Sequence, residues 1–379
     1  MKKSTKTDIV TAANINNLRV YTQEIDQALQ NAKDDIIDQA QRYSNNTLAS
    51  QAGFVAESVH VGSFNVDSAI KRSSLKTVKE KNGFHGDYKV LKGSKVIAKG
   101  EFKHYNTPKQ TENAMRGYDG RDLVGPSDQI EEIKKIAKTK AMKNKTTRPQ
   151  VSKEHQEVHK KATNAIKKEN VSSKPKTLKE IKKITKKAAR KKVVQNQEIL
   201  PDLTTSLKSS ALSGALDGAK TGAVFGGSIS TISNIKDVYD GKKSKSDALI
   251  DISKDITLNA IDSAVKNAAG SAAKTASLHI ADKVASQTAK RVLGSAAPIV
   301  VATTAVEIGK DVYKYANGEI DGETLGKNAA KCTATSAGAW AGAETGAVVG
   351  AMVGGPVGAA IGGVIGGIGA AIGIGALFD

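Results

Sequence analysis

Glycine recurs at every fourth position near the end of this 379-residue chain, and this spacing restricts the fold more than any other feature. The series comprises Gly338, Gly342, Gly346, Gly350, Gly354, Gly358, Gly362 and Gly366. Glycine destabilises a helix in water by roughly 1 kcal/mol relative to alanine. A bare stripe at helical spacing is therefore best explained by the close approach of another backbone, as in the small-xxx-small packing of membrane helices. The spacing predicts tightly packed helices.

The same region lacks charge over a length that could cross a membrane. Residues Thr345 to Phe378 include no charged side chain, whereas one crossing needs about 20 apolar residues. A turn at Gly354-Gly355-Pro356 would give a helical hairpin with arms at about 333–353 and 356–378. Glu344 in the first arm is costly in lipid unless it faces a partner or water. The alternative is a soluble bundle of Ala/Gly helices; we favour a protein that inserts into the membrane when triggered or assembled.

A shorter series, Gly214, Gly218, Gly222 and Gly226, begins the same half of the chain. Asp217 and Lys220 make this segment a weaker membrane span and a better interaction helix. Residues 201–379 are thus expected to form an all-α, Ala/Gly-rich glycine-zipper domain that contacts lipid or assembles into a homo-oligomer.

The charge balance points to polyanionic partners. The chain has 57 Lys and Arg against 38 Asp and Glu, a formal net charge of +19. Nucleic acid and anionic membrane surfaces are the natural partners of such a chain. Only 4% of residues are aromatic, which argues against a single-strand binder that stacks bases. The lone Cys332 excludes an intramolecular disulfide framework and a cysteine-ligated zinc site.

The first 200 residues divide by composition into three segments. Residues 1–48 carry an amphipathic helix from about Ile15 to Tyr43, with apolar residues at three- and four-residue steps. Residues 49–140 read as a small mixed α/β domain with a short helix at 49–60. Residues 141–200 form a lysine-rich helical arm; the lysine excess at 134–192 suggests an arm that follows phosphates, and a membrane-surface helix is the competing use. The fold class is α+β.

Two carboxylates and a lysine fall on a predicted hairpin within residues 49–140. Two alternating runs flank Lys92-Gly93-Ser94, a hairpin signal. Alternation places Glu101 and Lys103 on one face of the second strand, and pairing could bring Asp87 beside Glu101. Carboxylate oxygens bind Mg²⁺, and a lysine can orient the attacking water or stabilise the developing charge on a phosphodiester. Glu57, on the preceding helix, could complete the metal shell.

This motif resembles that of the PD-(D/E)xK restriction-endonuclease-like superfamily, which includes Holliday-junction resolvases and exonucleases. The resemblance covers about residues 49–140. It implies that Asp87 and Glu101 bind Mg²⁺ or Mn²⁺, that Lys103 is the motif lysine, and that Glu57 is the acidic residue of the first helix. Gly86 stands where the motif name has proline.

Residues after the motif offer further contacts. Lys109, Gln110, Arg116 and Gln129 are candidate ligands of DNA phosphates. His155 and His159 have the helical spacing of a zinc pair, but we expect a solvated helix there because the segment is highly polar.

The sequence therefore predicts a metal-dependent DNA endonuclease coupled to a membrane-associating glycine-zipper domain, in a bacterial anti-phage defence effector. No secretory signal is visible, so we expect synthesis in the cytoplasm and a peripheral or inserted position at the bacterial inner membrane. A partner subunit of a defence or delivery system is possible. The alternative is a membrane-permeabilising toxin or pore-forming effector whose N-terminal domain only binds nucleic acid or a partner; a third candidate is a scaffold protein of a mobile element.

Overall fold

The chain forms two compact units, seen in a computed structural model that describes residues 3–80, 86–190, 194–282, 297–345 and 370. The sheet unit comprises Glu24–Asp202, and the helical unit comprises Met1–Gln23 with Leu203–Asp379. The four segments predicted from composition do not coincide with these units. Helix α1 (Lys3–Arg42) contributes to both units, and residues 141–200 belong to the sheet unit rather than to a separate arm.

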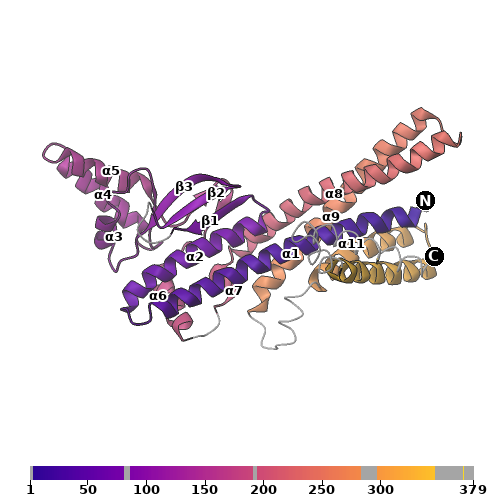
Figure 1. Ribbon diagram of the computed structural model, residues 1–379. Coiled ribbons are helices and arrows are strands. Elements are labelled where there is room, and N and C mark those ends of the chain that lie inside the picture. Colours follow the sequence, from indigo (N-terminus) through magenta and orange to yellow (C-terminus); the bar gives the residue numbers. More distant parts are fainter. Residues whose placement is uncertain (1–2, 81–85, 191–193, 283–296, 346–369, 371–379) are drawn as a thin grey trace. The chain divides into compact units, whose positions relative to one another are not determined.

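A mixed five-stranded sheet with order β1-β2-β3-β4-β5 organises the sheet unit (Figure 1). Its first three strands are antiparallel, and β3 pairs in parallel with β4, which pairs in parallel with β5. The strands are β1 (Leu75–Lys79), β2 (Tyr88–Lys92), β3 (Lys95–Phe102), β4 (Asp122–Val124) and β5 (Ala162–Thr163), and a small second sheet pairs β6 (Lys167–Lys168) with β7 (Val171–Ser172). The predicted α/β character of this region is confirmed.

Helix α2 (Leu48–Ile70) packs against this sheet and supplies part of its core. Phe64 of α2 lies in one buried cluster with Tyr88, Phe102 and Val124 of the sheet. The predicted helix at 49–60 is too short, since the helix continues through Gly62 to Ile70. A Cβ at Gly62 would lie 2.5 Å from the Ala32 Cβ of α1, so this glycine permits close helix packing rather than a turn.

The remaining helices of the sheet unit are short. They are α3 (Pro108–Ala114), α4 (Ile130–Asn144), α5 (Pro149–Lys161), α6 (Leu178–Ala189) and α7 (Asn196–Ile199). Helix α5 packs on α4 and leads directly into β5, while α6 packs on α2. The lysine-rich segment is therefore folded onto the sheet unit because its apolar positions are buried there, among them Val158, Ile181 and Ile184.

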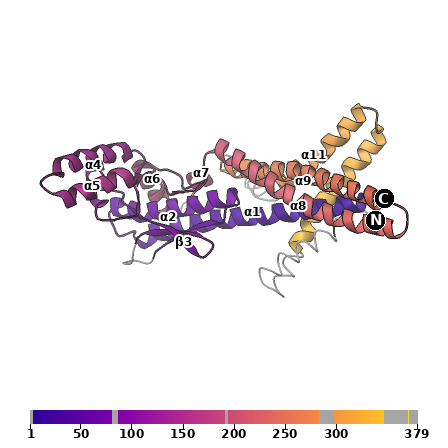
Figure 2. The ribbon, with the colours of Figure 1, turned by 90° about the horizontal axis from the view of Figure 1, so that it is seen from above.

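Two long helices, α8 (Leu203–Tyr239) and α9 (Lys245–Ala281), run side by side in the helical unit (Figures 1 and 2). Gly214, Gly218 and Gly222 of α8 face the backbone of α9; a Cβ at Gly214 would lie 2.5 Å from the Asn267 carbonyl oxygen. A side chain at any of these three positions would overlap α9. This first glycine series is thus the contact face of a helix pair.

Polar side chains form the contact between α1 and α9 in the helical unit. Asn14 of α1 donates to the Ser263 hydroxyl at 2.7 Å and accepts from the Asn267 amide at 2.8 Å, both on α9. The α9 residues Lys266 and Lys274 are also buried. Large apolar side chains are instead exposed, namely Leu212, Leu216 and Val224 on α8, Leu258, Ile261 and Val265 on α9, and Val301 on α11 (Ala297–Ala316).

The C-terminal glycine series lies mostly outside the described residues. Residues 322–345 are helical and include Gly338 and Gly342, whereas Gly346, Gly350, Gly354, Gly358, Gly362 and Gly366 are not described. Trp340 donates to Glu344 at 3.1 Å, which gives this carboxylate a polar partner. Among the helices that the structure describes, none combines the length and apolar character needed to cross a membrane.

Candidate active site

The start of β2 and the end of β3 bring two carboxylates together. Tyr88 is opposite Gly100 in the antiparallel register, and the Asp87 N–H donates to the Gly100 carbonyl at 2.9 Å. The Asp87 Oδ2 accepts a hydrogen bond from the Phe102 N–H at 2.7 Å. Asp87 therefore lies beside Glu101, as the hairpin pattern predicted, and its side chain is oriented by the backbone of β3.

Glycines on both strands permit this pairing. Gly86 has a φ of +120°, a conformation closed to proline, whose ring fixes φ near −65°. This explains the glycine before Asp87. A Cβ at Gly100 would overlap the ring of Tyr88, so the aromatic ring lies directly on the β3 backbone just before Glu101.

Lys103 joins the two carboxylates. Its Nζ lies 2.9 Å from the Glu101 Oε2 and 3.6 Å from the Asp87 Oδ2. The ring centroid of Tyr118 is 4.7 Å from the same ammonium. Burial lowers the pKa of Lys103, but Asp87 and Glu101 outweigh this effect and raise the pKa above its ordinary value. Lys103 is therefore an ammonium at neutral pH and acts as a positive charge rather than as a base.

Glu57 of α2 lies within electrostatic range of this group but is not joined to it by a hydrogen bond. Burial raises its pKa to about 8, and the negative charge of Asp87 adds to the effect, while Lys79 and Lys103 oppose it. The Lys79 ammonium forms an ion pair with Asp35, its Nζ lying 2.6 Å from the Asp35 Oδ1. Glu57 is therefore largely protonated at pH 7 unless a further cation approaches.

Arg121 completes the surroundings of Glu101, and sequence reasoning missed it. Its guanidinium donates to the Glu101 Oε1, and its Cζ lies 5.6 Å from the centre of the Tyr118 ring. Arg121 immediately precedes β4, which runs parallel to β3 and places Leu123 opposite Glu101. The sequence signal was the turn before it, where Gly117 and Gly120 have φ values of +80° and +74°.

The oxygen ligands here fit Mg²⁺ or Mn²⁺. Asp87 and Glu101 supply hard carboxylate oxygens, and both already lie within 4 Å of one cationic nitrogen, that of Lys103. Burial chiefly, and then the negative charge of Asp87, raise the pKa of Glu57, and a nearby cation would favour its ionised form. Within the described part of the chain, no three His, Cys, Asp or Glu side chains form a complete metal-binding group. Asp87 and Glu101 are thus the two side chains that would hold such a metal, with Glu57 as an additional carboxylate.

The four predicted phosphate ligands lie in different environments. Lys109 and Gln110 are exposed on α3, after the loop that follows Lys103. Arg116 forms an ion pair with Glu154 at 2.9 Å. Gln129 is buried, accepts from the Thr111 hydroxyl and donates to the Tyr105 carbonyl. Lys109 and Gln110 are therefore the two that remain accessible to a ligand.

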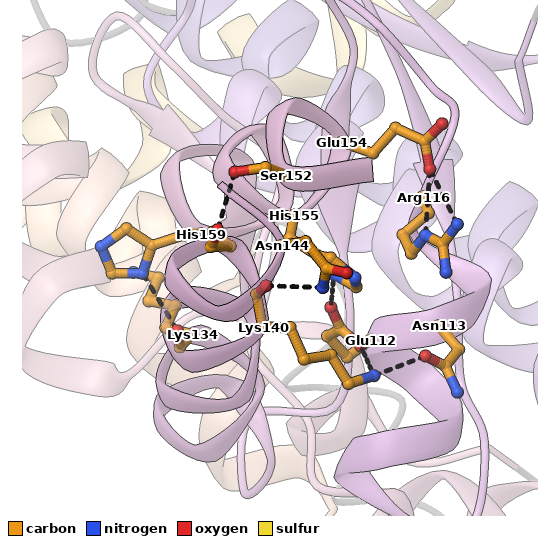
Figure 3. A network of polar contacts seen from close by, with 11 residues as sticks. Glu112, Asn113, Arg116, Lys134, Lys140, Asn144, Ser152, Glu154, His155 and His159 are labelled. Carbon is orange, nitrogen blue, oxygen red and sulfur yellow. Dashed lines mark hydrogen bonds and ion pairs between the residues drawn. The ribbon is translucent and has the colours of Figure 1, made fainter. Parts of the chain in front are cut away.

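A second polar cluster connects α3, α4 and α5 (Figure 3). The fully buried Glu112 lies 2.5 Å from the His155 Nδ1 and 2.6 Å from the Lys140 Nζ. His159 contacts the Lys134 carbonyl instead, so the two histidines have separate partners. The expectation of a solvated helix is wrong for His155, which is 2% exposed, because the buried Glu112 carboxyl is a hydrogen-bond partner of its ring nitrogen. This cluster connects helices, with Glu112 and His155 buried at its centre and Lys140 partly exposed.

Comparison with known proteins adds no relative. No family model, curated protein or solved structure matches this chain.

Proposed function

We propose that the sheet unit is a metal-dependent DNA endonuclease of the PD-(D/E)xK type and that the helical unit associates with a membrane, in an effector of bacterial anti-phage defence. The observation that carries the nuclease proposal is the position of the Lys103 ammonium, within 4 Å of both Asp87 and Glu101. Carboxylates and a protonated lysine on one wall are suited to phosphodiester hydrolysis.

Each residue has a defined task in this proposal. Asp87 and Glu101 would hold Mg²⁺, which when bound would supply Lewis acidity and a more acidic bound water. Lys103 stabilises the negative charge that develops on the phosphate oxygens as the new P–O bond forms and the old one breaks. Arg121 positions Glu101 through its ion pair. Glu57 is a carboxylate whose ionisation is favoured once a cation is present.

Plasmid cleavage by the purified full-length chain tests the proposal. We expect nicking or cutting in Mg²⁺, none in EDTA, and a loss of at least 100-fold in Glu101→Gln and Lys103→Met. Glu169→Gln is the matched control, since Glu169 is half-exposed and pairs with Lys92 away from the motif. Full activity of Glu101→Gln, or cleavage that persists in EDTA, would refute the nuclease assignment.

A second candidate function, membrane permeabilisation, is favoured by one specific observation. The helical unit buries polar and small residues such as Ser263, Asn267 and Gly218 while exposing Leu216 and Leu258. Apolar residues outside and polar residues inside are the distribution expected of helices packed in lipid.

Vesicle experiments separate the two functions. Permeabilisation alone predicts dye release from phosphatidylglycerol vesicles that Asp87→Asn leaves unchanged. The coupled nuclease predicts co-flotation with vesicles, DNA cleavage, and loss of cleavage alone in Asp87→Asn. Deletion of residues 345–378 is expected to abolish flotation; undiminished flotation of the truncated chain would contradict the role given to the C-terminal glycine series.

A further inference from the structure

A basic groove lies along α6 in the sheet unit. We define the α6 groove as the depression of about 770 Å³ between this helix, the loop at Asn106 and the start of α4. Six cationic residues of α6 and its C-terminus line it: Lys179, Lys182, Lys183, Lys186, Lys187 and Arg190. Its one acidic residue, Asp128, accepts a hydrogen bond from the Leu178 N–H at 3.1 Å and so caps the helix.

The fold of α6 directs these cations outward and holds them in place. Leu178, Ile181 and Ile184 are buried, and the helix packs on α2. A capping box between Thr177 and Glu180 stabilises the first turn. The lysines are therefore presented by a helix that packs on the sheet unit, in agreement with the helical character that the sequence predicted for this segment.

Four of the six cations are available to a ligand. Lys187 pairs with Glu198 at 2.9 Å, and Lys182 donates to the Asn106 side chain at 2.8 Å. Within the described part of the chain, no carboxylate lies within ion-pair distance of the other four, which are Lys179, Lys183, Lys186 and Arg190. From residue 179 to residue 190 a helix rises about 16 Å, which matches about five phosphates of one B-form strand.

The residues that line the α6 groove favour duplex DNA over other polyanions. No aromatic residue lines the groove, so a single strand would find no ring on which to stack its bases. A helix that lies on a membrane needs an exposed apolar face beside its lysines, whereas the apolar residues of α6 are buried, including Leu178, which also lines the groove. A phosphate backbone needs only positive charge at regular spacing.

The groove also lies close to the candidate active site along the chain. Asn106, on its rim, follows Lys103 by three residues, so their Cα atoms are at most about 11 Å apart. We propose that the α6 groove binds the phosphate backbone of duplex DNA next to the bond that the Asp87–Glu101–Lys103 group cleaves. The positioning role rests on the proposed nuclease function, whereas the binding itself does not.

Fluorescence anisotropy with a 25-base-pair duplex in EDTA tests the binding. The full-length Asp87→Asn chain is compared with the same chain carrying Lys179, Lys183, Lys186 and Arg190 all changed to Gln. Four lost phosphate contacts should make the slope of log K against log salt shallower by about 3 to 4. A rise from 50 to 200 mM salt should therefore weaken DNA binding by the groove variant roughly 100-fold less than binding by the parent chain. The matched control changes Lys135, Lys138, Lys143 and Lys145 to Gln, four exposed lysines in and just after α4.

Each outcome decides the assignment. A weaker, less salt-dependent complex for the groove variant alone supports it. Equal binding by the groove and control variants overturns it, as does equally tight, groove-dependent binding of polyglutamate or phosphatidylglycerol vesicles. Groove-dependent binding without Mg²⁺-dependent cleavage by the unmodified chain refutes the nuclease and leaves a DNA-binding site. Cleavage without groove-dependent binding refutes only the groove.

Discussion

Gly218→Ala in α8 tests the close packing of the two long helices. A Cβ at this position would overlap the carbonyl carbon and oxygen of Ser263 and would lie 2.8 Å from the Asn267 Cβ. Because backbone atoms cannot rotate away, α8 and α9 must separate. Overpacking costs about 1–3 kcal/mol, and the upper part of that range, about 2–3 kcal/mol, applies here because the overlapped atoms belong to the backbone, whereas alanine improves helix propensity by roughly 1 kcal/mol. We expect a net loss of about 1–2 kcal/mol in the free energy of unfolding.

Trp340 provides the assay, since it is the only tryptophan of the chain and lies in a buried cluster of the helical unit with Ile15, Leu18 and Ile299. Its fluorescence during urea unfolding reports on that unit. With a denaturant slope of about 2 kcal/mol per M, the midpoint should fall by about 0.5–1 M. Gly309→Ala is the control, because nothing lies within 4 Å of a Cβ there, and it should raise the midpoint. If Gly218→Ala also raises the midpoint, α8 and α9 do not pack as described.

Three further predictions concern the sheet unit. Mn²⁺ affinity, measured by electron paramagnetic resonance, should rise with pH until the Glu57 carboxyl ionises near pH 8, and Glu57→Gln should remove most of this rise; a pH-independent affinity would contradict it. Burial lowers the pKa of His60 well below its ordinary value and that of His104 to about 3. As the pH falls below about 6.5, these histidines become protonated in the unfolded state but not in the folded state, so each should lower the free energy of unfolding by about 1.4 kcal/mol per pH unit. His104→Asn should therefore reduce the slope of the free energy of unfolding, measured in urea, against pH. Glu112→Gln should destabilise the unit by about 2 kcal/mol in thermal unfolding because the buried carboxylate that contacts His155 and the partly exposed Lys140 is lost, whereas exposed Glu131→Gln should have almost no effect; equal melting temperatures would contradict this structural role of Glu112.

The parts of the sheet unit that the sequence predicts well are local. The turn at Gly93, which has a φ of +60°, and the alternation that follows it predict the hairpin and the meeting of Asp87 with Glu101. A strand reverses side-chain direction at each residue, so register and facing follow from a short segment. This explains why Lys103 also lies where the pattern placed it.

The parts that the sequence does not reveal depend on distant segments. The two-residue strand β5 pairs with β4 in parallel, almost 40 residues away in sequence, and so short a strand has no detectable periodicity. Arg121 reaches Glu101 only because β4 lies beside β3. The lysines of α6 were predicted to belong to a separate helical arm because composition does not show which surface buries Ile181 and Ile184.

The hydrogen-bonded interior of the helical unit has a thermal consequence. Asn14, Ser263 and Asn267 occupy positions that aliphatic side chains fill in an ordinary bundle. Exposure of apolar surface increases the heat capacity on unfolding, and exposure of polar surface decreases it. Unfolding of this unit is therefore expected to have a small heat-capacity increment and a flat stability curve. The packing of α1 on α9 would then have nearly the same free energy in the cold as at higher temperature.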